Sequence, residues 1–71
     1  MTTEAQIQQY IVQQRAVIAA SGRSDFWKQV DVMTLAGHVQ FLRRGLRSLV
    51  TVTGDDGVTR LVLQKEQNHE Q

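Results

Sequence analysis

Residues 34–63 read TLAGHVQFLRRGLRSLVTVTGDDGVTRLVL, and this stretch decides the fold. Leucine and valine recur in its first half at alternating intervals of four and three, the spacing of one face of an α-helix. The positions are Leu35, Val39, Leu42, Leu46 and Leu49. Valine and threonine then flank a turn sequence, residues 54–57, as is typical of a β-hairpin. A helix followed directly by strands at 50–52 and 58–63 is therefore predicted.

Two further helices are predicted upstream. Thr3 and Gln6 have the spacing of a capping box, which predicts a helix over residues 4–20. Its inward positions are Ile7, Tyr10, Ile11, Val17 and Ile18. Ser24 or Asp25 can cap a second, shorter helix. Val30, Val32 and Met33 also alternate as a strand would, but the helical interpretation is preferred.

Two glycines affect the start and the packing expected of the third helix. Thr34 can cap it, although Gly37 moves the expected start toward His38. Gly45 lies beside the apolar stripe, where we expect the first helix to pack against a bare backbone.

The expected hairpin register follows from the turn. A loop of two or four residues pairs Thr51 with Arg60 and Val52 with Thr59 in either case. Because side chains alternate along a strand, this register turns one set of residues toward the helices. That set is Val50, Val52, Leu61 and Leu63, with Thr51, Thr53, Val58 and Arg60 mainly on the other face.

Size and composition bound the class of protein. The 71 residues predict a single domain over 1–63 and a disordered polar tail over 64–71. The chain has no cysteine, which excludes a disulfide framework or a thiolate metal site and fits a reducing cytoplasm. No leader sequence and no apolar run of membrane-spanning length is recognised. A soluble, cytoplasmic protein is expected.

Catalytic residues, metal ligands and cofactor motifs are not recognised. His38 and His69 are the two histidines, and no carboxylate has the spacing to orient either one. Residues 54–57 lack the lysine and following helix of a phosphate-binding loop. We therefore expect a protein that is not an enzyme and that needs no cofactor.

A cationic strip lies opposite the leucine stripe of the third predicted helix. It consists of Gln40, Arg43, Arg44 and Arg47, with no acidic residue among them. Arginine can grip a phosphate or guanine, and glutamine can pair with adenine. The ordinary alternative is that exposed arginines only keep the helix soluble. The net charge of +1 means that any DNA binding must depend on this local cluster.

The order of three helices and a hairpin resembles the winged helix-turn-helix domains of small bacterial, plasmid and phage regulators. The resemblance implies an α+β fold, a recognition helix at about 37–49 and binding of double-stranded DNA. A homodimer is expected because one such helix buries too little surface to select a site alone. The resemblance also implies that Gln40, Arg43, Arg44 and Arg47 face DNA, and Arg60 could add a phosphate contact. Asp55 and Asp56 would repel the backbone at the hairpin tip.

The competing hypothesis is a protein-interaction module, such as an inhibitor or adaptor. Phe26 and Trp27 are adjacent and cannot both point inward, and Phe41 falls off the leucine stripe. Exposed aromatics would mark a partner surface or a homodimer interface, together with the glutamine-rich face of the first helix. The structural alternative is a core that wraps around Trp27 and uses Phe41 as a flank.

Overall fold

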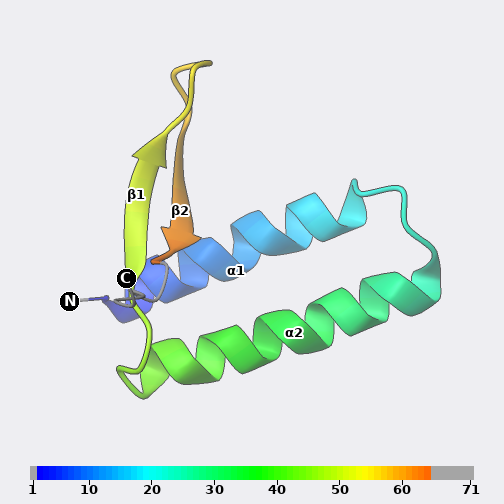
Figure 1. Cartoon of the computed structure of the whole chain (residues 1–71), viewed down its shortest axis with the longest axis horizontal. Helices are drawn as coiled ribbons and strands as arrows, with labels where there is room; N and C mark the ends of the chain where they lie inside the picture. Colours follow the sequence, from blue (N-terminus) through cyan, green and yellow to red (C-terminus); the bar gives the residue numbers. More distant parts are fainter. Residues whose placement is uncertain (1, 65–71) are drawn as a thin grey trace, which may run out of the picture.

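Two antiparallel helices and one β-hairpin make up the fold (Figure 1). The computed structural model describes residues 2–64. A disordered tail was predicted over 64–71, and its residues 65–71, which include His69, lie outside the described residues. The elements are α1 (Glu4–Ala19), α2 (Asp25–Arg43), β1 (Leu49–Thr53) and β2 (Thr59–Leu63). The predicted α+β class, with helices before an antiparallel hairpin, is confirmed. The predicted number of three helices is wrong.

The predicted starts of the first two helices are confirmed. The Thr3 hydroxyl accepts a hydrogen bond from the Gln6 backbone N–H at 3.1 Å, and the Gln6 side chain accepts one from the Thr3 N–H at 2.9 Å. These reciprocal bonds form the capping box and satisfy two backbone donors. Ser24 caps α2 by accepting from the Trp27 N–H at 3.4 Å. Local sequence therefore fixes where each helix begins.

The second and third predicted helices are one continuous helix, α2. A glycine inside a helix costs about 1 kcal/mol relative to alanine, which was the reason to expect a break near Gly37. Leu35 and Val39 on either side of it are buried against α1, and this packing offsets the cost. No helix-turn-helix junction divides residues 25–43, and the alternating residues 30–33 are helical and not a strand.

α2 ends at Arg43, six residues before the predicted end at Leu49. Gly45 has a left-handed backbone conformation, with φ of +77°. The Leu46 N–H bonds to the Phe41 carbonyl at 2.9 Å, and the Gly45 N–H bonds to the Leu42 carbonyl at 3.2 Å. These two bonds form a Schellman motif, in which glycine is the favoured residue.

The interpretation of Gly45 as a close-packing glycine is therefore wrong. A Cβ atom added there would meet nothing within 4 Å. Its role is to reverse the chain, and as a result Leu46 leaves the leucine stripe and is 64% exposed.

The hairpin register differs from the prediction by one residue. Its turn has three loop residues, because the Gly54 N–H bonds to the Val58 carbonyl and the Gly57 N–H bonds to the Gly54 carbonyl, each at 3.0 Å. Gly57 has a φ of +78°, as expected for a type I turn with a bulge. The resulting pairs are Thr51 with Leu61 and Val52 with Arg60.

The one-residue difference exchanges the faces of β1. Leu49 and Leu61 are buried, whereas Val50 and Val52 are exposed and not directed at the helices as predicted. Gln64, which was assigned to the tail, extends the pairing by donating its N–H to the Ser48 carbonyl at 2.9 Å.

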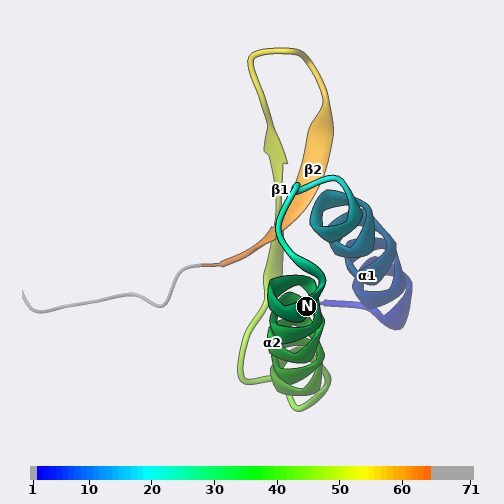
Figure 2. The same ribbon diagram turned by 90° about the vertical axis from the view of Figure 1, so that its right-hand side faces the viewer.

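A small core lies where the two helices meet the base of the hairpin. Its buried residues come from all four elements: Ile7, Tyr10, Leu35, Val39, Leu42, Leu49 and Leu61. Ile11 and Ile18 pack at its margin as predicted, but Val17 is 57% exposed. Figure 2 shows the hairpin rising away from the helices, so its outer half does not contribute to the core.

Gln13 joins α1 to the edge of β2. Its side-chain Nε2 donates to the Leu61 carbonyl at 2.6 Å, and its Oε1 accepts from the Leu61 N–H at 3.1 Å. The side-chain amide thus makes both hydrogen bonds that a neighbouring strand would make at this residue. Gln13 is not among the inward positions that helical spacing predicts for residues 4–20, so the sequence did not predict this contact.

Candidate interaction surface

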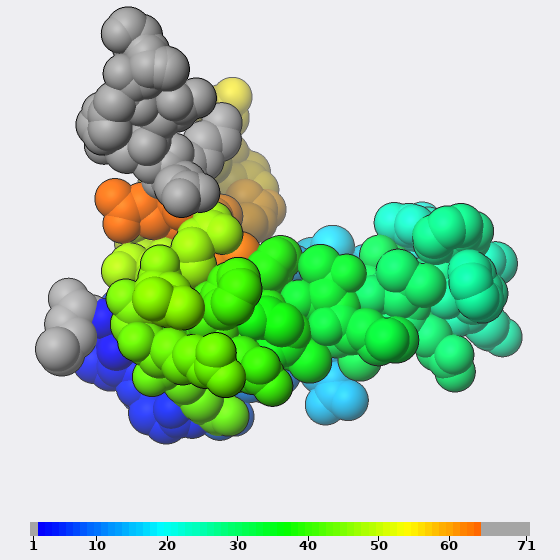
Figure 3. Space-filling view, turned by 60° about the horizontal axis from the view of Figure 1, so that its bottom comes forward, coloured from blue at the N-terminus to red at the C-terminus, as the bar shows by residue number. Residues whose placement is uncertain are grey.

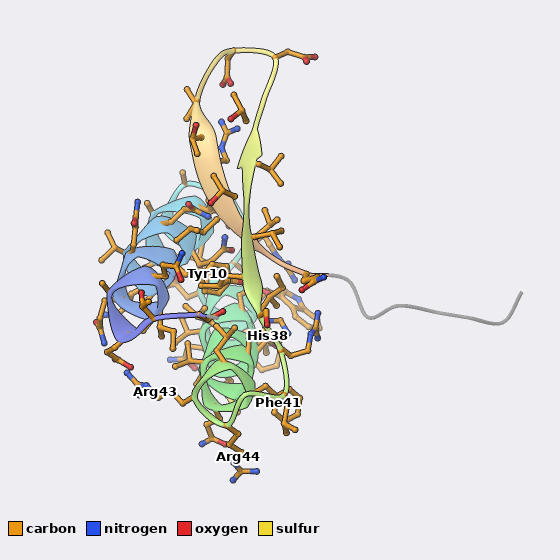
Figure 4. The ribbon with its side chains drawn as sticks, turned by 90° about the vertical axis from the view of Figure 1, so that its left-hand side faces the viewer. Tyr10, His38, Phe41, Arg43 and Arg44 are labelled. Atoms are coloured by element: carbon orange, nitrogen blue, oxygen red, sulfur yellow. The ribbon has the colours of Figure 1, made fainter. Side chains whose placement is uncertain are left out.

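The predicted DNA-binding residues do not form one strip. Arg43 turns toward α1, where its Nη2 lies 2.7 Å from Glu4 Oε2 and its Nε lies 3.3 Å from Oε1. Arg60 pairs with Asp56 at 3.2 Å within the hairpin. Figure 4 shows Arg43 and Arg44 at different sides of the end of α2. Two of the predicted cations are therefore already engaged by carboxylates of this chain.

Arg47 is held at the base of the hairpin. Its Nη2 donates to the Gln64 carbonyl at 3.0 Å, and its buried Nε has no hydrogen-bond partner among the described residues. Gln40 on α2 and Arg44, which caps the end of α2, are exposed, and neither side chain forms a hydrogen bond within residues 2–64. Of the five predicted contacts, these two are free to meet a ligand.

The ion pair between Arg43 and Glu4 links the end of α2 to the start of α1. Hydrogen bonds from Arg43, and then from Gln8, lower the pKa of Glu4 below its ordinary value of 4.5. The Glu4 carboxylate in turn raises the pKa of Arg43. Both groups are solvent-exposed, so the pair contributes little to the stability of the fold.

Acid should weaken this link in a way that depends on Arg43. Folding lowers the pKa of the Glu4 carboxyl, so the ionised carboxylate stabilises the folded state at every pH above the pKa of the unfolded chain. This stabilisation is lost as the pH falls through the lower pKa of the folded state. We expect the urea midpoint of Arg43→Gln to fall less than that of the wild type between pH 6 and pH 3. Arg44→Gln, which removes a neighbouring arginine without a described partner, should keep the wild-type pH dependence. Equal pH dependence in both variants would contradict the assignment.

All three predicted partner-binding aromatics are exposed. Phe26 is 65% exposed, Trp27 50% and Phe41 43%. The rings of Phe26 and Trp27 meet edge to face, with centroids 5.1 Å apart, and the Arg23 guanidinium lies 5.6 Å from the Trp27 ring centroid. The alternative of a core wrapped around Trp27 is therefore wrong, because the core consists of aliphatic residues and Tyr10.

A second apolar stripe runs along the side of α2 that faces away from α1. We call it the outer stripe; its members are Phe26, Val30, Met33, Gly37 and Phe41. Intervals of four, three, four and four residues keep them on one side of a helix. Met33, at its centre, is 72% exposed. Figure 4 shows Phe41 pointing away from α1, and Figure 3 shows the side chains of α2 forming an uncovered face along the molecule.

Sequence reasoning missed the outer stripe as a unit because it divided residues 25–43 between two helices. The signal was present, since the intervals are helical from Phe26 to Phe41. A helix with one apolar stripe packed inward and a second one exposed is unusual for a small soluble domain.

A shallow groove between the helices offers a weaker site. It has a volume of about 310 Å³ and is lined by Tyr10, Ile18, Leu35 and His38, with the ion pair of Arg23 and Asp31 at its rim. Burial raises the pKa of Tyr10.

Within residues 2–64, no group of three or more histidine, aspartate or glutamate side chains could hold a metal ion.

None of the helices described here is long and apolar enough to cross a bilayer. Comparison with protein-family models, with curated proteins and with solved structures gave no match. The resemblance to winged-helix domains stays a prediction, and the functional argument depends on the surface of this chain.

Proposed function

We propose that this protein is a non-catalytic protein-interaction module that binds through the outer stripe of α2. The observation that supports this proposal is the exposure of Phe26, Met33 and Phe41 on one side of a single regular helix. Scattered exposed apolar residues are normal, but several large ones along one side of a helix mark a contact surface. Aromatic side chains and methionine are also the residue types enriched at interfaces.

Helical regularity gives such a surface an energetic advantage. The backbone of residues 25–43 is already ordered as the helix α2, whose buried residues Leu35, Val39 and Leu42 pack on α1. Binding therefore orders side chains but not the main chain, which lowers its entropic cost. A helix whose apolar row enters a groove or packs on another helix is a recurring mode of protein recognition.

A DNA-binding regulator of winged-helix type is the second candidate. The observation that favours it is the exposure of Gln40 and Arg44, which lie four residues apart, with the guanidinium of Arg43 half-exposed at another side of the end of α2. It ranks second because Arg43 and Arg60 are paired with carboxylates of the same chain and the net charge is +1. Phosphate contacts would have to compete with those ion pairs.

Site-specific photocrosslinking tests the first proposal. A photoreactive phenylalanine analogue placed at Met33, in cells that make the protein, should give protein adducts on illumination. The matched control is the same analogue at Val12, which is 69% exposed on α1 and lies outside the outer stripe. Adducts from Met33 that are absent from Val12 support the proposal, whereas no adduct from Met33 or equal adducts from both positions would refute it.

A salt titration on labelled duplex DNA tests the second candidate. We expect no salt-sensitive affinity. If log affinity instead fell with log salt at a slope of several units, and Arg44→Ala flattened that slope, DNA binding would become the preferred function.

A further inference from the structure

We propose that the occupant of the outer stripe is a second copy of this chain, with the two α2 helices packed antiparallel about a twofold axis beside Met33. This inference rests on the proposed function, because it takes the outer stripe to be a protein contact. It specifies one partner, a second copy of the chain, and one orientation for that contact.

The spacing of large and small residues in the outer stripe is complementary to itself. When two α2 helices run antiparallel with Phe26 beside Phe41 of the second copy, Val30 lies opposite Gly37 and Met33 lies next to its counterpart. The bare backbone at Gly37 leaves room for Val30, since a Cβ atom there would meet nothing within 4 Å of this chain. The same contacts occur twice, as a twofold interface requires.

Charge favours the antiparallel orientation. Asp25 lies in the first turn of α2 and Arg44 caps its last turn, and neither side chain has an ion-pair partner among residues 2–64. Antiparallel helices bring each Asp25 near Arg44 of the second copy, whereas parallel helices would bring like charges together. Arg23, which the antiparallel alignment also brings to this end, is already paired with Asp31 at 3.2 Å.

The available area is close to what a stable dimer needs. With about 200 Å² for each fully exposed large side chain, the exposed fractions of Phe26, Met33 and Phe41 give roughly 360 Å² per copy, and Trp27, which lies beside the outer stripe, adds about 100 Å². Two copies then contribute about 900 Å² before any flanking polar residue is counted, near the lower limit of about 1,000 Å² for a specific interface. Residues 65–71 contain no apolar side chain that could cover this surface instead.

Sedimentation equilibrium tests the dimer. The 8.1 kDa chain should sediment at twice its mass at micromolar concentration. Gly37→Leu should raise the dissociation constant at least about tenfold by filling the space for Val30, while leaving the monomer folded, because leucine is the better helix former. A far-UV circular dichroism spectrum like that of the wild type and a cooperative urea transition confirm folding, while the loss of dimerisation itself lowers the urea midpoint. Val12→Leu is the control and should remain dimeric.

The absence of cysteine allows a direct test of the contact and its orientation. Met33→Cys chains should form a disulfide-linked dimer under mild oxidation, and Val12→Cys chains should not. Phe26→Cys chains should crosslink to Phe41→Cys chains in a mixture and much less to themselves. Preferential self-crosslinking of Phe26→Cys would overturn the antiparallel orientation.

The outcomes separate this inference from the proposed function. A chain that remains monomeric up to millimolar concentration, while Met33 still crosslinks to another protein, overturns the homodimer and leaves the interaction module standing. A monomer without Met33 adducts refutes both. A dimer that Gly37→Leu does not weaken overturns the packing of α2 proposed here.

Discussion

Leu42→Ala should lower the free energy of unfolding by about 2–5 kcal/mol, the range for removing a large aliphatic side chain from a core. Leu42 is only 4% exposed, in the last turn of α2, and belongs to the core cluster that joins both helices to Leu49 and Leu61. Domains below about 80 residues have little stability to lose. At 37 °C we therefore expect Leu42→Ala to be largely unfolded. Urea denaturation followed by circular dichroism, at one fixed protein concentration, measures the effect.

Val12→Ala is the matched control for the core substitution. Val12 is 69% exposed, so its truncation should change the free energy of unfolding by less than about 0.5 kcal/mol. A similar loss in the two variants would mean that the core lies elsewhere than at the junction of helices and hairpin.

Gln13→Met should cost about 2 kcal/mol, although methionine has nearly the same shape as glutamine and is a good helix former. The substitution removes the bonds of 2.6 and 3.1 Å to the Leu61 carbonyl and N–H, in a partly buried place where water replaces them poorly. The resulting instability should be greatest in the hairpin. Hydrogen exchange at the Leu61 amide should therefore accelerate more than exchange within α2.

Gln9→Met provides the control for this prediction, because Gln9 is exposed on α1 and makes no side-chain hydrogen bond among the described residues. Unchanged exchange at Leu61 in Gln13→Met would show that the side-chain amide does not hold β2 in solution.

Short-range signals in the sequence were sufficient to locate the helix starts and the hairpin turn. The capping box of Thr3 and Gln6, the cap at Ser24 and the turn at residues 54–57 each act within a few residues, and each lies at its predicted position. The buried positions Ile7, Tyr10, Leu35, Val39 and Leu42 also follow from helical spacing alone.

Two errors arose where one local signal admits two geometries. From the sequence, Gly45 could lie inside a helix or follow a helix in a left-handed conformation. Its φ of +77° shows that it follows the helix. The turn sequence suits loops of two, three or four residues, and the three-residue loop moves the register by one. In each case two backbone hydrogen bonds close the observed geometry.

Contacts between distant parts of the chain could not be predicted from the residues. Glu4 and Arg43 are 39 positions apart and Gln13 and Leu61 are 48 apart, so no spacing rule connects them. Both contacts changed the candidate site, because the first engages an arginine assigned to DNA and the second fixes the hairpin whose base holds Arg47.

The hairpin that rises from the helices ends in a turn exposed on all sides, remote from the core and from the outer stripe (Figure 1). Because the cost of lengthening a flexible loop grows only slowly with its length, an epitope or a fluorophore-bearing peptide inserted between Asp55 and Asp56 should be tolerated. The tip is therefore a suitable site at which to immobilise or label the molecule without covering either helix.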